Sequence, residues 1–359
     1  GSPEASSSWT PGTVRIGSTE LSLCAITGVT TSRYARIEGL ASRVTTGALQ
    51  SGAQAGMAVA ALGCFDQGFY NRFGFGNGPY IHILRFDPAT LRVDRLSRAP
   101  DRLDPDKPQE SHQARLRRNR LHGGVNIPLP AQSELDIFDS HNPLGVGFRD
   151  SSGELTHHMW LSGKDRENGP LSVGGASVST PEQWLELLGY LRSLSSDVRL
   201  IRMPQPPGLQ LSDLIHQPFR NMEVRFRGEY QMRFNMLPYY QLRILDMEAC
   251  IAALDIPGPG REFTLRVSDP VAADFDSEWA GTTGDYRLTL GSPCQIERLT
   301  TPVGEPDIRG GIGAFTRWWA GVLPASSLVI SDEFRASAEV CKALDARPTL
   351  PPPLPDWDF

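Results

Sequence analysis

Residues 36–76 hold three signals that decide the fold: Arg36-Ile37-Glu38-Gly39-Leu40-Ala41, then Met57-Ala58-Val59-Ala60-Ala61-Leu62, then Phe69-Tyr70-Asn71-Arg72-Phe73-Gly74-Phe75-Gly76. The first signal opens a helix predicted over residues 39–51, in which apolar side chains recur at helical spacing on one stripe. The second is an apolar run of strand length, and a further strand is predicted before the helix at residues 21–29. This order predicts a strand–helix–strand unit that ends in an aromatic turn.

Composition and charge place the protein in a broad class. The chain has 359 residues, of which 40% are hydrophobic and 21% charged, as expected for a globular protein of two to three domains. Its net charge of −6 argues against nucleic acid as a partner and mildly favours a cationic substrate. No run of 18 or more apolar residues occurs, so no membrane span is expected.

The cysteines indicate the cellular compartment and do not indicate a metal or disulfide site. The chain has five, with no Cys-x-x-Cys pair and no Cys/His cluster, which argues against a metal site and against a disulfide framework. Residues 1–12 are rich in Ser and Pro and are predicted to be loose, with no signal peptide. These observations predict a cytoplasmic protein with reduced thiols.

The middle of the chain contains a charged segment and a second helix signal. Residues 98–120 are highly charged, and their basic run, Arg115, Arg117, Arg118 and Arg120, has two open interpretations, a solvated helix face or loop and a phosphate contact. Thr180-Pro181-Glu182-Gln183 is a capping box that predicts a helix, and a strand follows at residues 198–203. The same order of elements as in residues 39–62 suggests a duplicated α/β unit.

From about residue 240 the pattern changes to short strands followed by helices, which is typical of an α+β domain. A short helix is predicted at 246–254, and the following elements are strands at 263–267, 286–290 and 295–299 and helices at 311–322 and 332–345. The proline-rich tail 351–359 is predicted to be extended.

The start of the first predicted helix has chemical meaning. A helix N-terminus presents unsatisfied N–H groups and a partial positive charge, so it attracts phosphate. Gly39 permits close backbone approach, Ala41 leaves the first turn uncrowded, and Arg36 adds a positive charge. The segment therefore predicts a site for a phosphorylated cofactor.

Two segments carry a resemblance to a known family. Residues 28–41, Gly-Val-Thr-Thr-Ser-Arg-Tyr-Ala-Arg-Ile-Glu-Gly-Leu-Ala, resemble the acyl-CoA loop of GCN5-related N-acetyltransferases. Residues 69–76 resemble the Tyr-x-Arg-Phe-Gly segment of one branch, the enhanced intracellular survival (Eis) acetyltransferases. Arg243-Ile244-Leu245-Asp246, Phe263–Val267 and the terminal Trp357-Asp358-Phe359 are similar to the C-terminal part of that branch.

The resemblance implies an α+β fold of three parts. It implies a partial acyl-CoA-binding GCN5-type domain at 13–82, a second GCN5-like domain at 83–239, and a sterol-carrier-like domain with the C-terminal tail at 240–359. The family has further residues before the strand that ends at Val29, which supply its first strands and a helical lid, so the N-terminal part of the first domain is expected to be absent.

The resemblance also implies residue roles. Acetyl-CoA would be held by Val29, Thr31, Arg36, Gly39, Leu40 and Arg72. Tyr70 would be the general acid for the departing thiolate, and the terminal carboxylate of Phe359 the general base for the amine. Asp358, Trp357 and Phe65 would contact the substrate, although Phe65 stands where the family often has a small polar residue. Ile37 and Glu38 replace basic positions of the family, and Glu38 is unfavourable beside a pyrophosphate.

Elementary acid–base chemistry sets conditions on these roles. The pKa of a phenol, near 10, is close to the pKa of a thiol, so proton transfer from the phenol to a thiolate is nearly balanced. A terminal carboxylate near 3.5 is a poor base, and raising its pKa by roughly three units requires about 4 kcal/mol from the environment. Burial and the like charges of Asp356 and Asp358 would act in that direction.

The sequence thus predicts an acetyl-CoA-dependent N-acetyltransferase without a metal, acting on primary amines of a cationic, aminoglycoside-like small molecule or on lysine. A homo-oligomer, trimer or hexamer, is expected from the resemblance. The alternative is a non-catalytic, ligand-binding relative that retains the fold. A hydrolase, suggested by His122, His157-His158 and Ser162-Gly163, is less favoured because no Gly-x-Ser-x-Gly elbow occurs.

Overall fold

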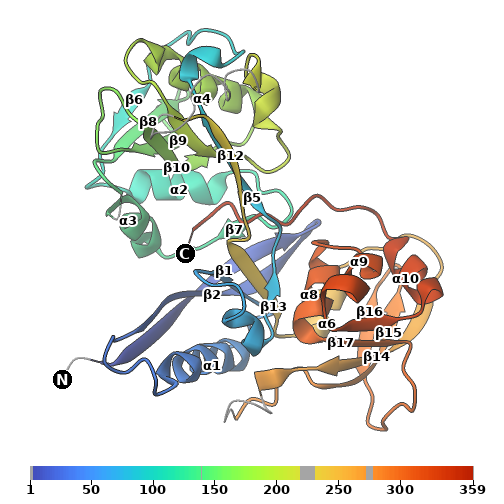
Figure 1. Ribbon diagram of the computed structural model, residues 1–359. Helices are drawn as coiled ribbons and strands as arrows, with labels where there is room; N and C mark the ends of the chain where they lie inside the picture. The colour runs from blue at the N-terminus through green and yellow to red at the C-terminus, as the bar shows by residue number, and fades with distance from the viewer. Residues whose placement is uncertain (1–2, 139, 219–230, 272–277, 359) are drawn as a thin grey trace.

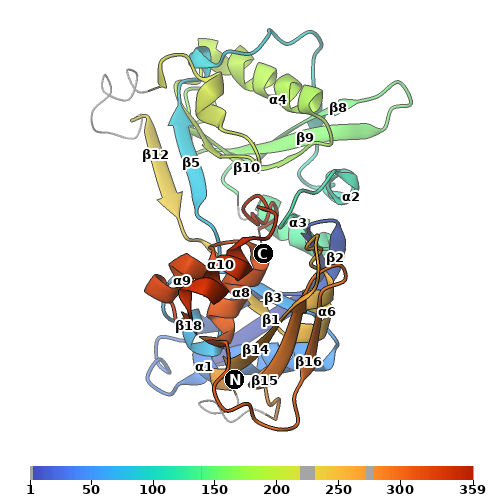
Figure 2. The same cartoon turned by 90° about the vertical axis from the view of Figure 1, so that its right-hand side faces the viewer.

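The computed structural model describes residues 3–138, 140–218, 231–271 and 278–358, which form three β-sheets with helices packed on them. Figure 1 shows the middle sheet at the top, the first sheet with α1 at the lower left, and the third sheet with the last helices at the lower right. After a quarter turn, the middle sheet still lies above the other two (Figure 2). The expected mixed α/β organisation is confirmed at this level.

The first sheet has the order β4-β13-β3-β2-β1-β7. Its members are β1 (Ala5–Ile16), β2 (Thr19–Thr31), β3 (Val59–Gly63), β4 (Gly76–Asn77), β7 (Val125–Asn126) and β13 (Tyr240–Ile244). The helix α1 (Leu40–Gln54) joins the parallel strands β2 and β3, as the apolar stripe and the apolar run predict. The predicted strand–helix–strand unit is therefore confirmed.

The first residues are more ordered than predicted. Residues 1–12 were expected to be loose, but β1 begins at Ala5 and pairs with β2 along its whole length. Gly17, at φ 57, makes the tight turn between the two strands. The prediction was wrong because the polar residues of β1 obtain their hydrogen bonds from β2, and strand formation depends on such pairing more than on composition.

The middle sheet has the order β12-β5-β11-β10-β9-β8-β6. The parallel pair β10 and β11 is joined by the helix α4 (Pro181–Ser193), which begins with the predicted capping box at Thr180 and Gln183. This repeats the topology of β2, α1 and β3. The strands of this sheet are β5 (Ile81–Phe86), β6 (Asp101–Leu103), β8 (Leu144–Arg149), β9 (Leu155–Ser162), β10 (Leu171–Ser177), β11 (Ile201–Pro204) and β12 (Arg233–Leu237). The helices α2 (Gln109–Arg117) and α3 (Pro130–Phe138) lie between this sheet and the first one (Figures 1 and 2).

The third sheet has the order β16-β15-β14-β17-β18 and packs against α8. Its strands are β14 (Arg261–Ser268), β15 (Gly284–Leu290), β16 (Gln295–Arg298), β17 (Ile308–Gly311) and β18 (Phe334–Ala336). The associated helices are α6 (Met247–Ala252), α8 (Ile312–Ala320), α9 (Ala325–Ser331) and α10 (Ala338–Asp345). The single helix expected at 332–345 is wrong, because residues 334–336 pair with β17 and Ser337 caps a new helix.

The strand β13 connects the first and third parts of the chain. It follows the expected boundary at residue 240, yet it lies in the first sheet between β3 and β4. Arg243 on this strand is buried and forms an ion pair of 2.6 Å with the equally buried Asp269, which follows β14. The first sheet is therefore completed by residues from beyond the first domain that the sequence predicted.

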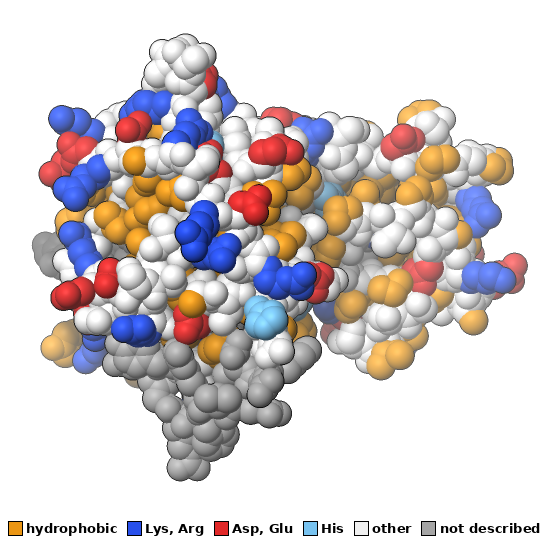
Figure 3. Space-filling view, turned by 90° about the horizontal axis from the view of Figure 1, so that it is seen from above, with side chains coloured by type: hydrophobic (Ala, Val, Ile, Leu, Met, Phe, Trp, Pro, Cys, Tyr) orange, Lys and Arg blue, Asp and Glu red, His pale blue; other side chains and the backbone are white. Residues whose placement is uncertain are grey.

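Two surface properties bear on the partners. No helix among the described residues is long and apolar enough to span a bilayer. Acidic and basic side chains alternate over the face seen from above, around smaller apolar areas (Figure 3). This face therefore presents no large field of one sign, which a nucleic-acid surface would require.

His158 on β9 provides a test of the packing around the middle sheet. Burial and then the charge of Arg115 lower the pKa of His158 to about 3. Below the ordinary pKa of about 6.5, the unfolded chain binds a proton at this histidine that the folded chain does not. The free energy of unfolding therefore decreases by about 1.4 kcal/mol for each pH unit by which the pH is lowered. We expect His158→Gln to flatten this decline between pH 6.5 and 4 in urea titrations, and an unchanged slope would contradict the burial of a neutral imidazole.

Candidate active site

The ladder between the parallel strands β2 and β3 ends before β2 does. It runs from Leu23 and Val59 to Ile26 and Leu62, and β3 ends at Gly63. Beyond it, β2 continues to Thr31 and pairs with β1. Val29 and Thr31 therefore lie on a part of β2 that extends beyond the end of β3.

The N-terminus of α1 follows the loop 32–39 and has no side-chain cap. Gly39 is the N-cap residue, at φ 69, and a Cβ atom at this position would meet nothing within 4 Å. The amides of Ser42 and Arg43 donate to the Gly39 carbonyl, so the N–H groups of Leu40 and Ala41 precede the first helical hydrogen bonds. Uncapped amides at a helix N-terminus favour an anion such as a phosphate.

The side chains around this helix end are open to solvent. Arg36 and Glu38 are exposed, and Ile37 is 97% exposed. The two charges are of opposite sign, so Arg36 would attract a phosphate and Glu38 would repel it. The loop offers backbone donors with little net charge from its side chains.

Tyr70 lies in a ring of aromatic side chains beyond the end of β3. It opens the short 3-10 turn Tyr70–Phe73, and its side chain is 2% exposed. The rings of Phe69, Phe65 and Phe75 meet it edge-on, with centroids at 4.9, 5.6 and 6.2 Å. Burial, and then the nearby Cys64, raise the pKa of Tyr70 to about 12, so the phenol is protonated at neutral pH.

The neighbours of Tyr70 include two other predicted residues. Phe65 is 74% exposed, and its ring covers one side of Tyr70. The guanidinium of Arg72 lies 5.9 Å from the ring centres of both Phe69 and Phe73. Gly74, at φ 78, ends the turn. Only glycine fits at this position, because a Cβ atom there would strike Arg243 and Ile312. The turn is thus held against β13 and α8.

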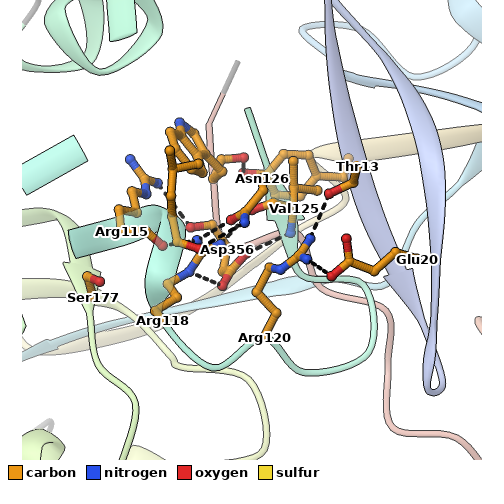
Figure 4. A network of polar contacts seen from close by, with 12 residues as sticks. Thr13, Glu20, Arg115, Arg118, Arg120, Val125, Asn126, Ser177 and Asp356 are labelled. Carbon is orange, nitrogen blue, oxygen red and sulfur yellow. Dashed lines mark hydrogen bonds and ion pairs between the residues drawn. The ribbon is translucent and has the colours of Figure 1, made fainter. Parts of the chain in front are cut away.

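The C-terminal tail runs from α10 back across the molecule to the junction of the first and middle sheets (Figure 1). There the two carboxylate oxygens of Asp356 accept hydrogen bonds of 2.8 and 2.6 Å from Nε and Nη2 of Arg118 (Figure 4). The amide of Val125 on β7 also donates to Asp356, at 2.9 Å. Burial alone would raise the pKa of Asp356, but the ion pair with Arg118 holds it below the ordinary value.

Trp357 is fixed between the two anchored carboxylates. Its side chain is 1% exposed, and the guanidinium of Arg115 lies 4.1 Å above the ring centre. The hydroxyl of Tyr240 donates to the Trp357 carbonyl at 3.3 Å. Trp357 therefore shapes the wall of the site from a packed position, with little ring surface left to meet a substrate directly.

Asp358 lies beside the end of β3. Its Oδ1 accepts a hydrogen bond of 2.9 Å from the hydroxyl of Tyr239. The Tyr239 ring covers Gly63, where a Cβ atom would come within 2.8 Å of the hydroxyl, and the amide of Cys64 donates to the Tyr239 carbonyl at 2.6 Å. The tail thus meets the strand end that leads to Phe65 and Tyr70, while Phe359 lies outside the described residues.

Two cavities adjoin this end of the tail. A cleft of about 480 Å³ is lined by residues of the middle sheet, by Tyr239 and Tyr240, and by the tail from Leu354 to Asp358. A smaller cavity of about 260 Å³ shares Asp358 and Arg115 and also contains Asp136 and His158. The larger volume lies within the range of small-molecule sites.

Several residues of this site were not predicted from the sequence. The basic run was interpreted as a solvated face or a phosphate contact, but the side chains of Arg118 and Arg120 are only 3% and 7% exposed and hold the tail and the first hairpin. Arg120 donates to Thr13 and pairs with Glu20 across the hairpin (Figure 4). The acidic residues Asp356 and Asp358 in an otherwise apolar tail were the sequence signal for a basic partner.

His122 and His157, two of the three histidines that suggested a hydrolase, have structural partners. His122 accepts from the amide of Gly17 at 3.0 Å and donates to the Ala320 carbonyl at 2.8 Å. His157 lies 3.0 Å from Glu186 on α4. Across the described residues, no group of three or more His, Cys, Asp or Glu side chains is placed to hold a metal ion.

Comparison with known proteins gives these features a context. Residues 5–78 match the acetyltransferase (GNAT) domain family. The matched region contains β2 and β3, the uncapped helix end and Tyr70. This match, with neighbours described as acetyltransferases, supports an acetyltransferase enzyme. No curated protein matches the chain by sequence.

Solved structures share the fold over nearly the whole chain. A probable N-acyltransferase from Enterococcus faecalis V583 has a TM-score of 0.77 at 17% identity, covering 99% of this chain and 86% of that one. A GCN5-related N-acetyltransferase from Anabaena variabilis has a TM-score of 0.75 at 13% identity, with 98% and 86% covered. Eis1 from Mycobacterium abscessus has a TM-score of 0.74 at 19% identity, with 99% and 87% covered. At these identities the likeness shows the fold.

The buried ion pair of the tail is open to a stability test. Asp356→Asn removes the charge but not the bulk, and it leaves the guanidinium of Arg118 buried without its counter-charge. We expect the free energy of unfolding to fall by about 3–5 kcal/mol in urea titrations. The control is Glu305→Gln, which breaks the exposed pair with Arg309 and should cost less than about 1 kcal/mol. Equal small effects would show that the tail pair is not buried.

Proposed function

We propose that the chain is an acetyl-CoA-dependent N-acetyltransferase that acts on a primary amine of a cationic small molecule, aminoglycoside-like, or of a lysine. The observation that carries the proposal is the position of Asp358 at the end of β3, where Tyr239 joins the tail to the strand that leads to Tyr70. The uncapped end of α1 would bind the phosphates of the cofactor, the protonated phenol of Tyr70 would act as the acid, and the tail would supply the carboxylates.

The cofactor would lie beyond the end of β3, beside the part of β2 that continues to Thr31. Main-chain groups of Val29 and Thr31 would meet the pantetheine and pyrophosphate, and the amides at Gly39 and Leu40 would hold the pyrophosphate, with charge from Arg36 and Arg72. The thioester would then point along β3 toward Tyr70. No metal is required in this arrangement.

The reaction balances with the groups proposed. The terminal carboxylate of Phe359 would take a proton from the ammonium, and the free amine would attack the thioester carbonyl, forming the C–N bond. As the C–S bond breaks, the phenol of Tyr70 would donate its proton to the leaving thiolate, and the second proton lost by the attacking nitrogen would return to the Tyr70 phenolate, leaving the amide, the free thiol and a protonated Phe359 carboxyl. Burial makes the phenol of Tyr70 a weaker acid than in water, and burial in the same site would raise the pKa of the leaving thiol in the same direction.

The acceptor would approach through the cavities that share Asp358. Asp136 lines the smaller one, and burial raises its pKa to about 6. A cationic amine nearby would favour the charged form of both carboxylates. Asp356 cannot contribute as the sequence suggested, since its charge is offset by Arg118. Phe65 and Trp357 would form apolar walls.

The wider organisation is part of the same proposal. The expected domains at 13–82, 83–239 and 240–359 correspond to a GCN5-type unit, a second GCN5-like unit and a sterol-carrier-like unit. The repeated β–α–β topology of β10, α4 and β11 supports the second unit. A homo-oligomer, trimer or hexamer, in the cytoplasm would complete the resemblance.

The first test removes one oxygen atom. Tyr70→Phe keeps the aromatic packing, so the protein should fold and bind acetyl-CoA in isothermal titration calorimetry. Its kcat for acetylation of an aminoglycoside or a lysine peptide should fall about 10²-fold or more, the usual contribution of a general acid. A wild type that binds no acetyl-CoA and transfers no acetyl group would favour a non-catalytic ligand-binding relative instead.

The second test concerns the charge at the helix end. Glu38 is exposed beside the proposed pyrophosphate position, so Glu38→Gln removes a repulsion. We expect the Kd for acetyl-CoA to fall by about two- to fivefold at low salt, an exposed charge effect below about 1 kcal/mol that added salt screens. Glu339→Gln, in the first turn of α10, is the control. No change in affinity at low salt would argue against a phosphate at α1.

A further inference from the structure

The last residues of the chain are held at two points on either side of Trp357. Arg118 binds the carboxylate of Asp356, and Tyr239 binds that of Asp358. The two anchors come from different parts of the molecule. Arg118 follows α2 of the middle part, while Tyr239 precedes β13 of the first sheet. The position of the tail is therefore fixed relative to both.

The guanidinium of Arg118 has all its hydrogen-bond donors in use. Its Nη1 donates to the Arg115 carbonyl at 2.6 Å and to Asn126 at 2.7 Å, and its Nη2 also donates to the Val125 carbonyl at 2.6 Å (Figure 4). With the two bonds to Asp356, each of the five N–H donors of the guanidinium has an acceptor. A rigid, fully bonded guanidinium fixes the approach of the tail with little freedom, which a lysine could not reproduce.

Tyr239 links the tail to the end of β3. Its ring covers Gly63 and its carbonyl accepts from Cys64, so the side chain has little room to move. Cys64 is also an electrostatic neighbour of Tyr70. Tyr239 and Cys64 therefore connect Asp358 to the proposed acid through successive contacts.

We propose that Arg118 and Tyr239 are positioning residues for acetyl transfer: Arg118 fixes where the tail enters, and Tyr239 fixes its last described carboxylate beside the end of β3. This inference rests on the proposed function. Neither residue touches the reacting atoms, and both act by holding the tail against the end of β3, the strand that leads to Tyr70. A displacement of about 1 Å at such a site can lower a rate by 10²-fold.

The experiment compares Tyr239→Phe, Arg118→Lys and Arg118→Gln with wild type, and Tyr190→Phe on α4 is the matched control. Tyr190 packs on the core of the middle sheet, away from the tail. Steady-state kinetics give kcat, its pH profile and KM for acetyl-CoA. Digestion with a carboxypeptidase, followed by mass spectrometry, reports how firmly the tail is held without any reference to activity.

For Tyr239→Phe we expect kcat to fall about tenfold or more, as a hydrogen bond to a charged group is lost, while KM for acetyl-CoA stays unchanged. The pH profile of kcat should change, because the end of the chain that bears the proposed base is no longer held in place by the bond to Asp358. Arg118→Gln should lose more activity and be trimmed faster, and Arg118→Lys should recover part of both. Tyr190→Phe should match wild type in each measurement.

The outcomes separate the inference from the function on which it rests. An active wild type whose kcat and pH profile survive Tyr239→Phe overturns the positioning role of Tyr239. Losses in the Arg118 variants that follow only the folded fraction, with trimming as slow as in wild type, overturn that of Arg118. A wild type without acetyl transfer overturns the proposed function, and faster trimming of Arg118→Gln would then show that Arg118 holds the tail in a protein of another activity.

Discussion

The contact between Arg118 and Asp356 is the interaction on which the geometry of the site depends. A buried guanidinium is costly to desolvate, and its attraction for a carboxylate offsets that cost only where every remaining donor is bonded. Arg118 meets this condition, with acceptors from α2, β7 and the tail. The acceptors on α2 and β7 lie within a few residues of Arg118, and only the tail comes from far along the sequence. Because β7 pairs with β1 of the first sheet, the pair couples the order of the tail to the docking of the middle part on that sheet.

The docking of the tail also determines the surroundings of the end of β3. Without the tail in place, Tyr239 would have no carboxylate to bind, and the wall between Gly63 and the cleft would lose its outer layer. The aromatic side chains around Tyr70 make the site apolar on one side, while the carboxylates of Asp358 and Asp136 make it acidic on the other. An acceptor that is cationic and carries an amine would meet both, which is the physical content of the proposed specificity.

The sequence predicted the local elements and missed the long-range contacts. The stripe of α1 and the capping box of α4 are determined by neighbours within a few residues, so both were predictable. The strand β1 was missed because its polar residues become a strand only through pairing with β2. Arg118 was misjudged for a similar reason, since a basic run is usually solvated unless a distant carboxylate reaches it. The contact of Tyr239 with Asp358 left no signal in either segment alone.

The two β–α–β units show how one topology can serve different ends. In the middle sheet, Thr180 and Gln183 cap α4, so its first amides are already bonded and offer little to an anion. In the first sheet, Gly39 has no side chain to offer, and the amides of α1 remain for a ligand. The ladder of β10 and β11 also ends early, and residues beyond it line the cleft together with Trp184 and the tail. Given the proposed function, the first unit would hold the cofactor, and the tail and the acceptor would occupy the cleft beyond the β10–β11 ladder of the second unit.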